Sequence, residues 1–399
     1  MHQSWIEAAF IRGGSSKGVF FHARNLPADA GERDRIILDV LGSPDPYGRQ
    51  LNGMGGGISS LSKVVIVGPP THPDADVDYT FGQVAVDRPL VDYAGNCGNL
   101  SSAVGPFAID EGLVTRDDGD AVLVRLYNTN TKKIVHARFA VRGGMPEVAG
   151  DFAIAGVAGT GAKIRLDFLS PGGAVACDLL PTGNVTDMLH VEGLGPFCVS
   201  CVDATVPVAY VAARDVGLDG TESPDDIEAK PGLMELLERL RRAAAVMMGL
   251  AKSPADVALG VPKVAMVCSP ASFKILTDAT VPADAHDIAI RILSMGRVHR
   301  AVTLTGAMCL ATACRVDGTI PNEMVRQTAL ENKDIRVANP SGVISVGADV
   351  SRAGNGWTAG AAVVYRTQRR LMQGQVGYRN RLIARSVPAG DRIVNTRGT

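Results

Sequence analysis

Two stretches of this chain repeat one pattern, and that repeat narrows the folds open to it. In each, strand-like residues lead to a short glycine-containing turn and a helix of small residues: AGNCGNLSSAVG at 94–105 and TLTGAMCLATAC at 303–314. The length of 399 residues exceeds what one hydrophobic core usually supports. We therefore predict an α+β protein of two similar domains, 1–183 and 184–399, facing one cleft. The crossover lies near 180–187, and a return of the last strand to the first domain stays open.

Hydrophobic periodicity places the main elements. Apolar alternation predicts strands at 64–68, 77–86, 121–130, 134–141 and 263–269, with closing strands near 342–350 and 360–372. Helical spacing predicts helices at 100–114, 231–251 and 305–314, and a further helix from about Asp287 to Arg300. The helix at 100–114 begins just after Cys97, which places that thiol at a helix start.

Charge and targeting signals exclude several classes of function. The 40 basic and 41 acidic residues give a formal net charge of −1, so nothing favours a nucleic-acid or anionic-membrane partner. The start MHQSWIEAAF lacks a signal-peptide pattern, and no segment has the roughly 20 apolar residues of a membrane span. Seven cysteines, an odd number, suit reduced thiols. We expect a soluble cytoplasmic protein, and a homodimer is left open.

The cysteines differ in their surroundings. Cys198 and Cys201 form a C-x-x-C, but they lie in an apolar run without a second pair, which favours burial over a metal or redox role. Cys97 instead lies in N-C-G-N at the predicted helix start, where the helix dipole favours a thiolate. It could act as a nucleophile or a proton carrier. No histidine lies in a motif that marks it as a partner base, so we prefer acid–base chemistry.

Three segments rich in glycine and serine predict close approach of the backbone to a ligand: 12–18, 52–63 and 94–102. None fits a phosphate-binding or dinucleotide-binding pattern, so no cofactor is expected. The same turns suit a carboxylate, because backbone N–H groups and small polar side chains bind anions. Lys63 ends the second segment before an apolar strand. A desolvated lysine can act as a base, and the alternative is a surface lysine at a strand start.

Six motifs occur in this order: RGGSSKGVFF, GSPDPYGRQLNGMGGGISSLSKVVIV, DVDYTFGQVAV, VDYAGNCGNLSSAVGPFAI, PTGNV and SMGRVHRA. Together they strongly resemble the PrpF family of isomerases over nearly the whole chain. That family includes 2-methylaconitate cis-trans isomerase, methylitaconate delta-isomerase and 4-oxalomesaconate tautomerase. The resemblance implies a diaminopimelate-epimerase-like fold, in which each of two similar domains wraps a β-sheet around a central helix.

The resemblance also assigns roles. It places the family's catalytic lysine on Lys63 and its cysteine on Cys97. Proton abstraction from an unsaturated di- or tricarboxylate would be followed by return of a proton at the same or the allylic carbon. The expected substrate-binding residues are Ser15, Ser16, Met54, Ser59, Ser60, Asn96, Gly98, Asn99, Ser101, Ser294, Arg297 and Met308. Arg297 is expected either to bind a carboxylate or to form a surface salt bridge.

Two rival functions remain at this point. Amino-acid epimerases of this fold use two cysteines, one from each half, whereas the second-half turn TGAM has none. A carboxylate-binding protein without activity is the other rival, and retention of both Lys63 and Cys97 argues against it. The substrate subtype stays open. GGGISSLSK departs from the GGATSSTSK typical of methylaconitate isomerases, and DVDYTFGQVAV is closer to the methylitaconate branch, whereas GSPDPYG favours methylaconitate.

Overall fold

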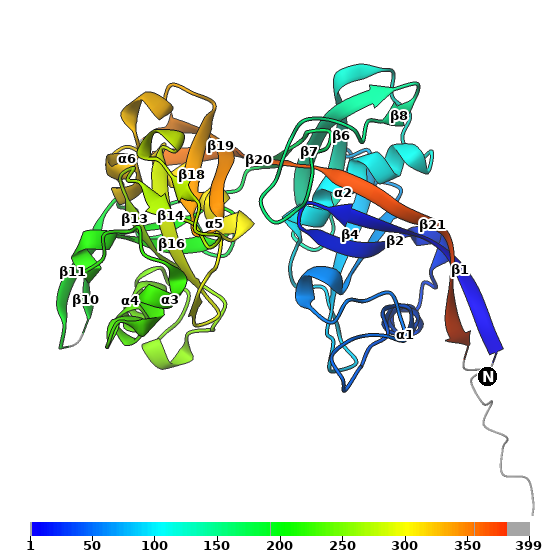
Figure 1. Cartoon of the computed structure of the whole chain (residues 1–399), viewed down its shortest axis with the longest axis horizontal. Helices are drawn as coiled ribbons and strands as arrows, with labels where there is room; N and C mark the ends of the chain where they lie inside the picture. The colour runs from blue at the N-terminus through cyan, green and yellow to red at the C-terminus, as the bar shows by residue number, and fades with distance from the viewer. Residues whose placement is uncertain (1, 192, 355, 381–399) are drawn as a thin grey trace, which may run out of the picture.

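The computed structural model describes residues 2–191, 193–354 and 356–380, which form two lobes (Figure 1). The N-terminal lobe contains helices α1 (Ala30–Leu41) and α2 (Gly98–Asp110) and the strands β1 (His2–Gly13), β2 (Ser16–His22), β3 (Lys63–Gly68), β4 (Val77–Val84), β5 (Val91–Asp92), β6 (Gly119–Asn128), β7 (Lys133–Arg142), β8 (Met145–Pro146), β9 (Ile164–Leu169) and β21 (Gln368–Asn380). Among the described helices, none combines the length and the apolar character of a membrane span.

The C-terminal lobe contains four helices among its described residues, α3 (Pro224–Ala229), α4 (Leu233–Met247), α5 (Leu304–Ala313) and α6 (Ile320–Met324). Its strands are β10 (Asp187–Val191), β11 (Gly195–Asp203), β12 (Pro207–Ala212), β13 (Lys263–Cys268), β14 (Phe273–Lys274), β15 (Thr280–Val281), β16 (Ile288–Ser294), β17 (Arg297–Val298), β18 (Asp334–Asn339), β19 (Gly342–Ala353) and β20 (Gly356–Arg366). The helices predicted at 100–114, 231–251 and 305–314 correspond to α2, α4 and α5.

Each lobe wraps its sheet around one central helix. Helix α2 is buried from Leu100 to Ile109, and it contacts β1, β2, β3, β6, β9 and β21. A helix that is apolar on all sides is stable only in such a buried position. Gly105 lets α2 approach the sheet closely, since a Cβ there would lie 2.7 Å from the Phe139 ring. Helix α5 takes the corresponding place in the other lobe, against β11, β12, β18, β19 and β20.

The two lobes share one order of strand directions. Strands β2 and β3 pair in parallel, as do β12 and β13. Strand β3 then pairs antiparallel with β4, and β13 pairs antiparallel with β16. The next pairs, β4–β6 and β16–β18, are again parallel. The predicted architecture of two similar lobes, each with a β-sheet around a central helix, is thus confirmed.

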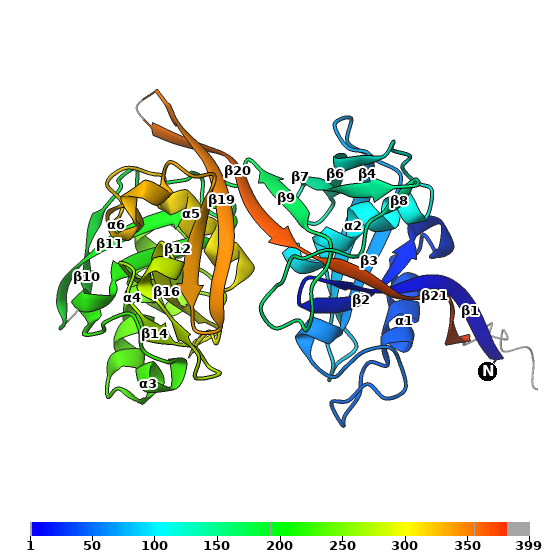
Figure 2. The same cartoon turned by 45° about the horizontal axis from the view of Figure 1, so that its top comes forward.

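Two strands connect the lobes. Strand β20 pairs with β19 of the C-terminal lobe and with β9 of the N-terminal lobe, and it runs between them in Figure 2. Strand β21 continues into the N-terminal lobe and pairs with β1. Residues at the end of β20 therefore lie between the lobes.

The helix predicted from about Asp287 to Arg300 is wrong, because this segment forms β16 and β17. Strand β16 is covered on both faces. Ile290 and Ile292 belong to the core around α5, and Leu293 packs in the cluster that contains the buried face of α4. A strand buried on both faces loses the polar–apolar alternation and resembles a buried helix in sequence.

Candidate active site

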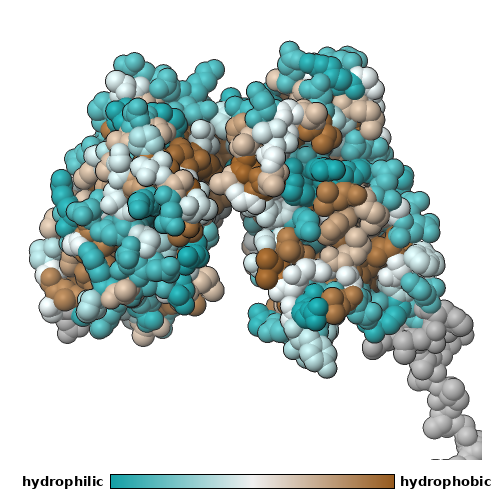
Figure 3. All heavy atoms as spheres, in the orientation of Figure 1, coloured by the Kyte–Doolittle hydropathy of each residue, from teal (hydrophilic) through white to brown (hydrophobic). Residues whose placement is uncertain are grey.

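A cleft of about 470 Å³ lies between the lobes. Figure 3 shows this hollow with hydrophobic atoms on both sides. Its lining comes from both lobes: Ser15, Ser16, Ser59, Ser60, Lys63, Cys97, Asn99, Phe152, Ala153, Ile154, Ala155, His299, Ala301, Val302, Thr303, Leu304, Asn339, Val343, Ile344, Ser345, Tyr365 and Arg366. The lining includes Lys63 and Arg366 but no aspartate or glutamate. Such a cleft favours an anionic ligand.

Lys63 is the first residue of β3, and its side chain is largely buried, with 8% of its surface exposed. Its Nζ donates a hydrogen bond to Oε1 of Gln83, 2.5 Å away on the neighbouring strand β4. The Gln83 amide nitrogen donates to the carbonyls of Ser62 (2.9 Å) and Ser59 (3.1 Å). These bonds fix the amide with its oxygen toward Lys63. Gln83 is therefore a positioning residue for the amine.

Gln83 was missing from the sequence-based site, although a signal existed. The register of β3 and β4 places Lys63 directly opposite Gln83. Pairing the two predicted strands by their turn would have brought these residues together.

Cys97 is the N-cap residue of α2, and its side chain makes no capping hydrogen bond. Its Sγ lies 4.0 Å from Oγ of Ser16 on β2, and the residue is partly exposed to the cleft. Other cysteines pack in or against the core, where burial raises the pKa of Cys201 and Cys309 to about 12 and that of Cys268 to about 11. Only Cys97 among the seven cysteines lines the cleft.

A hydrogen-bonded network under Cys97 holds the start of α2. The Asn96 side chain accepts the Cys97 backbone N–H at 2.7 Å and donates to the Tyr79 hydroxyl at 3.1 Å. Tyr79 and Ser101 share a hydrogen bond of 2.9 Å. Burial raises the pKa of Tyr79 to about 12, so this hydroxyl stays neutral. Asn96 and Ser101 thus orient Cys97 through hydrogen bonds to its backbone.

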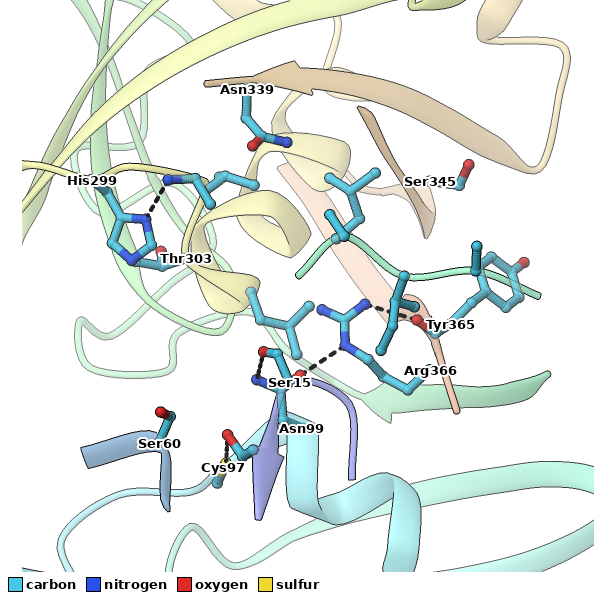
Figure 4. Close-up of a pocket in the computed structure, with 18 of the residues that line it drawn as sticks. Ser15, Ser60, Cys97, Asn99, His299, Thr303, Asn339, Ser345, Tyr365 and Arg366 are labelled. Carbon is cyan, nitrogen blue, oxygen red and sulfur yellow. Dashed lines mark hydrogen bonds between the residues drawn. The ribbon is translucent and has the colours of Figure 1, made fainter. Parts of the chain in front are cut away.

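Arg366, at the end of β20, is the cation that the sequence did not reveal. Its Nε donates to Oδ1 of Asn99 at 2.9 Å, and one terminal nitrogen donates to the Tyr365 carbonyl at 2.7 Å. Burial lowers its pKa to about 10, which still leaves it cationic at neutral pH. Figure 4 shows the guanidinium directed toward Asn99 and Ser15. No carboxylate among the described residues forms an ion pair with it.

The structure brings together seven of the predicted site residues. Those that line the cleft are Ser15, Ser16, Ser59, Ser60, Lys63, Cys97 and Asn99. Gly98 begins α2, where a Cβ would lie 2.7 Å from Leu304 of α5, so glycine allows the two helix starts to meet. Met54 instead packs beside the core of α1.

The predicted second-half residues lie away from the lining. Arg297 is exposed and forms a bidentate salt bridge with Glu228, 2.6 Å at its shortest, which is the alternative left open for it. Met308 is buried in α5, four residues past the helix start that faces the cleft. Ser294 accepts a hydrogen bond from Lys263. The substrate roles predicted for Arg297 and Met308 do not agree with these positions.

Metal-ligating side chains do not gather in the described part of the chain. No three His, Cys, Asp or Glu residues there come close enough to hold an ion together. The lining offers hydroxyls, amides, one thiol, one imidazole, the Lys63 amine and the Arg366 guanidinium. This donor set suits carboxylate oxygens.

The fold and the cleft define a two-lobe α+β protein with an amine and a thiol on one wall of the cleft. Residues 3–379 match the family described as PrpF protein, and the chain belongs to this family. It is 41% identical to the 3-methylitaconate isomerase of Eubacterium barkeri, over 94% of this chain and 97% of that protein. It is 38% identical to the 2-methyl-aconitate isomerase of Shewanella oneidensis, over 93% and 96% of the two chains.

A solved structure of an isomerase has the same overall fold. The crystal structure of a methylitaconate-delta-isomerase superposes with a TM-score of 0.88 at 38% identity, covering 95% of this chain and 96% of that one. The named relatives are isomerases over nearly their full length, so the expectation of an isomerase is confirmed at the level of the enzyme class.

Proposed function

We propose that this chain isomerises small unsaturated di- or tricarboxylates by moving a proton along an allylic system, without a cofactor. The observation that carries the proposal is the cleft itself, which combines the Lys63 amine and the Cys97 thiol with the cationic Arg366 and no acidic side chain. We infer the 2-methylaconitate cis-trans reaction first. Methylitaconate delta-isomerase and 4-oxalomesaconate tautomerase activities are the alternatives.

The proton chemistry follows from the two groups on the N-terminal wall. Lys63, as the neutral amine, removes a proton from a carbon that a conjugated carboxylate makes acidic. The C–H electron pair then enters the conjugated system, and a dienolate forms. Bond rotation or reprotonation at the allylic carbon gives the isomer. The proton returns from Lys63 or from the Cys97 thiol, and a well-placed acid–base group contributes about 10² to 10⁴ in rate.

The remaining polar groups suit substrate binding. Arg366 can hold one carboxylate by charge-assisted hydrogen bonds, and it stabilises the negative charge that spreads into that carboxylate in the dienolate. Asn99 bonds to Arg366 and to Ser15, and Ser16 lies near Cys97, so these residues offer further polar groups. Ser59 and Ser60 are suited to a second carboxylate near Lys63. The reacting carbon would then lie between the two anchored groups.

The apolar part of the lining favours a substrate with an alkyl group. Phe152, Ile154, Val302, Leu304 and Ile344 all face the cleft. A methyl group in contact with such side chains gains about 0.8 kcal/mol of binding. This supports a methyl-substituted acid ahead of oxalomesaconate.

An amino-acid epimerase is disfavoured on two counts. Thr303 is the N-cap residue of α5, the place that corresponds to Cys97 at the start of α2, so the second thiol is lacking. The lining also has no carboxylate to pair with the ammonium group of an amino acid. We also propose a cytoplasmic location, which the seven free cysteines support.

The test is a substrate screen followed by ultraviolet absorbance and proton NMR. Methylaconitate, methylitaconate, aconitate and oxalomesaconate are each incubated with the purified protein. Turnover of methylaconitate alone would support the first subtype, and turnover of another acid alone would reassign it. If none of the four acids is isomerised and none exchanges a carbon-bound proton in D₂O, the proposal is wrong.

A further inference from the structure

The C-terminal lobe has a lysine at the position that corresponds to Lys63. Lys263 is the first residue of β13, as Lys63 is the first residue of β3. Lys63 donates to Gln83 on the next antiparallel strand, and Lys263 donates to Oγ of Ser294 on β16 at 3.0 Å. The register that pairs Ala265 with Ile292 continues to Lys263 opposite Ser294. The two lysines are therefore equivalent under the internal repeat.

Lys263 points to the same side of its sheet as Lys63 does. Alternate residues of a strand face one side. Val65 and Val67, which follow Lys63 at this spacing, pack in the core around the central helices, and so do Ala265 and Val267 after Lys263. Each lysine thus lies on the side of its sheet that faces the core containing the central helices.

The ammonium of Lys263 has no acidic partner in the described chain. Only 9% of the residue is exposed, and Ser294 is its hydrogen-bond acceptor. The nearby Arg241 is also cationic, but its charge is paired with Glu238 at 2.7 Å. Burial, and then Arg241, lower the pKa of Lys263. A buried ammonium of this kind gains from an anion brought close to it.

His299 connects the surroundings of Lys263 with the cleft, because its backbone N–H donates to the Ile292 carbonyl at 2.8 Å, two residues before the Ser294 that accepts from Lys263. The imidazole lines the cleft wall opposite Lys63, and its Nδ1 accepts the backbone N–H of Ala301 at 3.1 Å (Figure 4). Burial, and to a smaller extent the charge of Lys263, lower the pKa of His299. The imidazole is therefore neutral, and Nε2 carries its N–H. The positive charge of Lys263 reaches the cleft through this imidazole.

We propose that Lys263 sets the charge specificity of the cleft, attracting a further carboxylate to the wall formed by His299 and Thr303. This rests on the function proposed above and names the substrate class more closely. Arg366 and the serine-rich turns hold two carboxylates, and Lys263 selects an acid that carries a third. Because Lys263 does not line the cleft, it is a positioning residue that acts through its electric field.

Two saturated acids test this without turnover. Propane-1,2,3-tricarboxylate and propane-1,2-dicarboxylate differ by one terminal carboxylate, and their binding is measured by isothermal titration calorimetry. Lys263→Met should weaken tricarboxylate binding about tenfold and dicarboxylate binding less than about twofold. Lys263→Arg should retain the preference. Lys252→Met, which removes an exposed charge from the same lobe, is the matched control and should change neither affinity.

The outcomes separate the two proposals. Equal loss for both acids in Lys263→Met, or an unchanged preference, would overturn the role of Lys263 while leaving the isomerase proposal intact. Binding of neither acid by the wild type would count against the carboxylate cleft itself. Ser294→Asp places a carboxylate beside the Lys263 ammonium and keeps the lysine. It should abolish the preference as well, which covers the case in which Lys263→Met does not fold.

Discussion

Replacing Gln83 with glutamate tests the role of Lys63 without touching that residue. In the wild type, the neutral amide oxygen of Gln83 accepts a hydrogen bond from Lys63 Nζ at 2.5 Å. Gln83→Glu puts a carboxylate of nearly the same shape at this place. The new negative charge favours the ammonium form of the lysine, which cannot remove a proton.

The expected magnitude follows from the distance and the burial. Two unit charges 4 Å apart attract by about 4 kcal/mol at an effective dielectric constant of about 20. A close opposite charge typically moves a protonation equilibrium by about 1 to 3 pH units. We therefore expect the acidic limb of the kcat/KM profile to move up by about 1 to 2 pH units. Activity below the limb falls about 10- to 100-fold and recovers in more alkaline buffer.

The variant also changes the bonds that hold residue 83. A carboxylate cannot donate to the carbonyls of Ser62 and Ser59, which accept from the Gln83 amide in the wild type. The loss costs about 1 to 3 kcal/mol of the free energy of unfolding. Thermal melting measures this separately from the pH profile. Gln83→Met is the control, since it removes the same bonds without adding charge.

The assay is kcat/KM against pH for the wild type and both variants, on whichever acid the substrate screen identifies. Gln83→Met should lower the rate without raising the acidic limb. An unshifted limb in a folded Gln83→Glu variant would refute Lys63 as the base.

Three further predictions concern other groups. Arg366→Met should lower kcat/KM by about 10² to 10³, because a charge-assisted carboxylate contact is lost, and Arg366→Lys should recover part of the rate. Arg297→Met removes an exposed ion pair and should leave kcat/KM unchanged. Steady-state kinetics of the three variants test this. Cys97→Ser should lower the rate by about 10² to 10⁴ if the thiol returns the proton, while thermal melting stays level or rises, because serine is the better N-cap residue. Burial lowers the pKa of His286 in the folded state below its ordinary value, so the unfolded chain binds more protons as the pH falls through about 6.5. The melting temperature should therefore drop from pH 7 to pH 5, and the drop should be smaller in His286→Gln; an equal drop in both proteins would exclude this histidine as a contributor.

Local patterns predicted the parts of the site that depend on short segments. Cys97 could be placed at a helix start because the glycine-containing turn and the apolar spacing of α2 lie side by side in sequence. Lys63 could be placed at the start of β3 for the same reason. The family resemblance, rather than its spacing, gave Lys63 its role. The repeat of α2 in α5, each after a glycine-containing turn, was visible in the sequence as well.

Groups that meet through distant pairing could not be predicted. Arg366 contacts Asn99, 267 positions away, because β20 pairs with β9 and ends between the lobes. No local pattern marks Arg366 as a site residue, whereas the exposed Arg297 lies in a family motif and was a candidate for binding a carboxylate. The strand β16 was missed for a related reason, since burial on both faces removes its alternation.

The most direct test of the account is solvent-deuterium exchange with Lys63→Ala. The wild type, incubated in D₂O with the acid that it isomerises, should place deuterium on the substrate carbon, as followed by proton NMR. Lys63→Ala should retain the fold and substrate binding but lose both the exchange and the isomerisation by at least about 10². Exchange at the wild-type rate in a folded Lys63→Ala protein would contradict the central claim that Lys63 moves the proton.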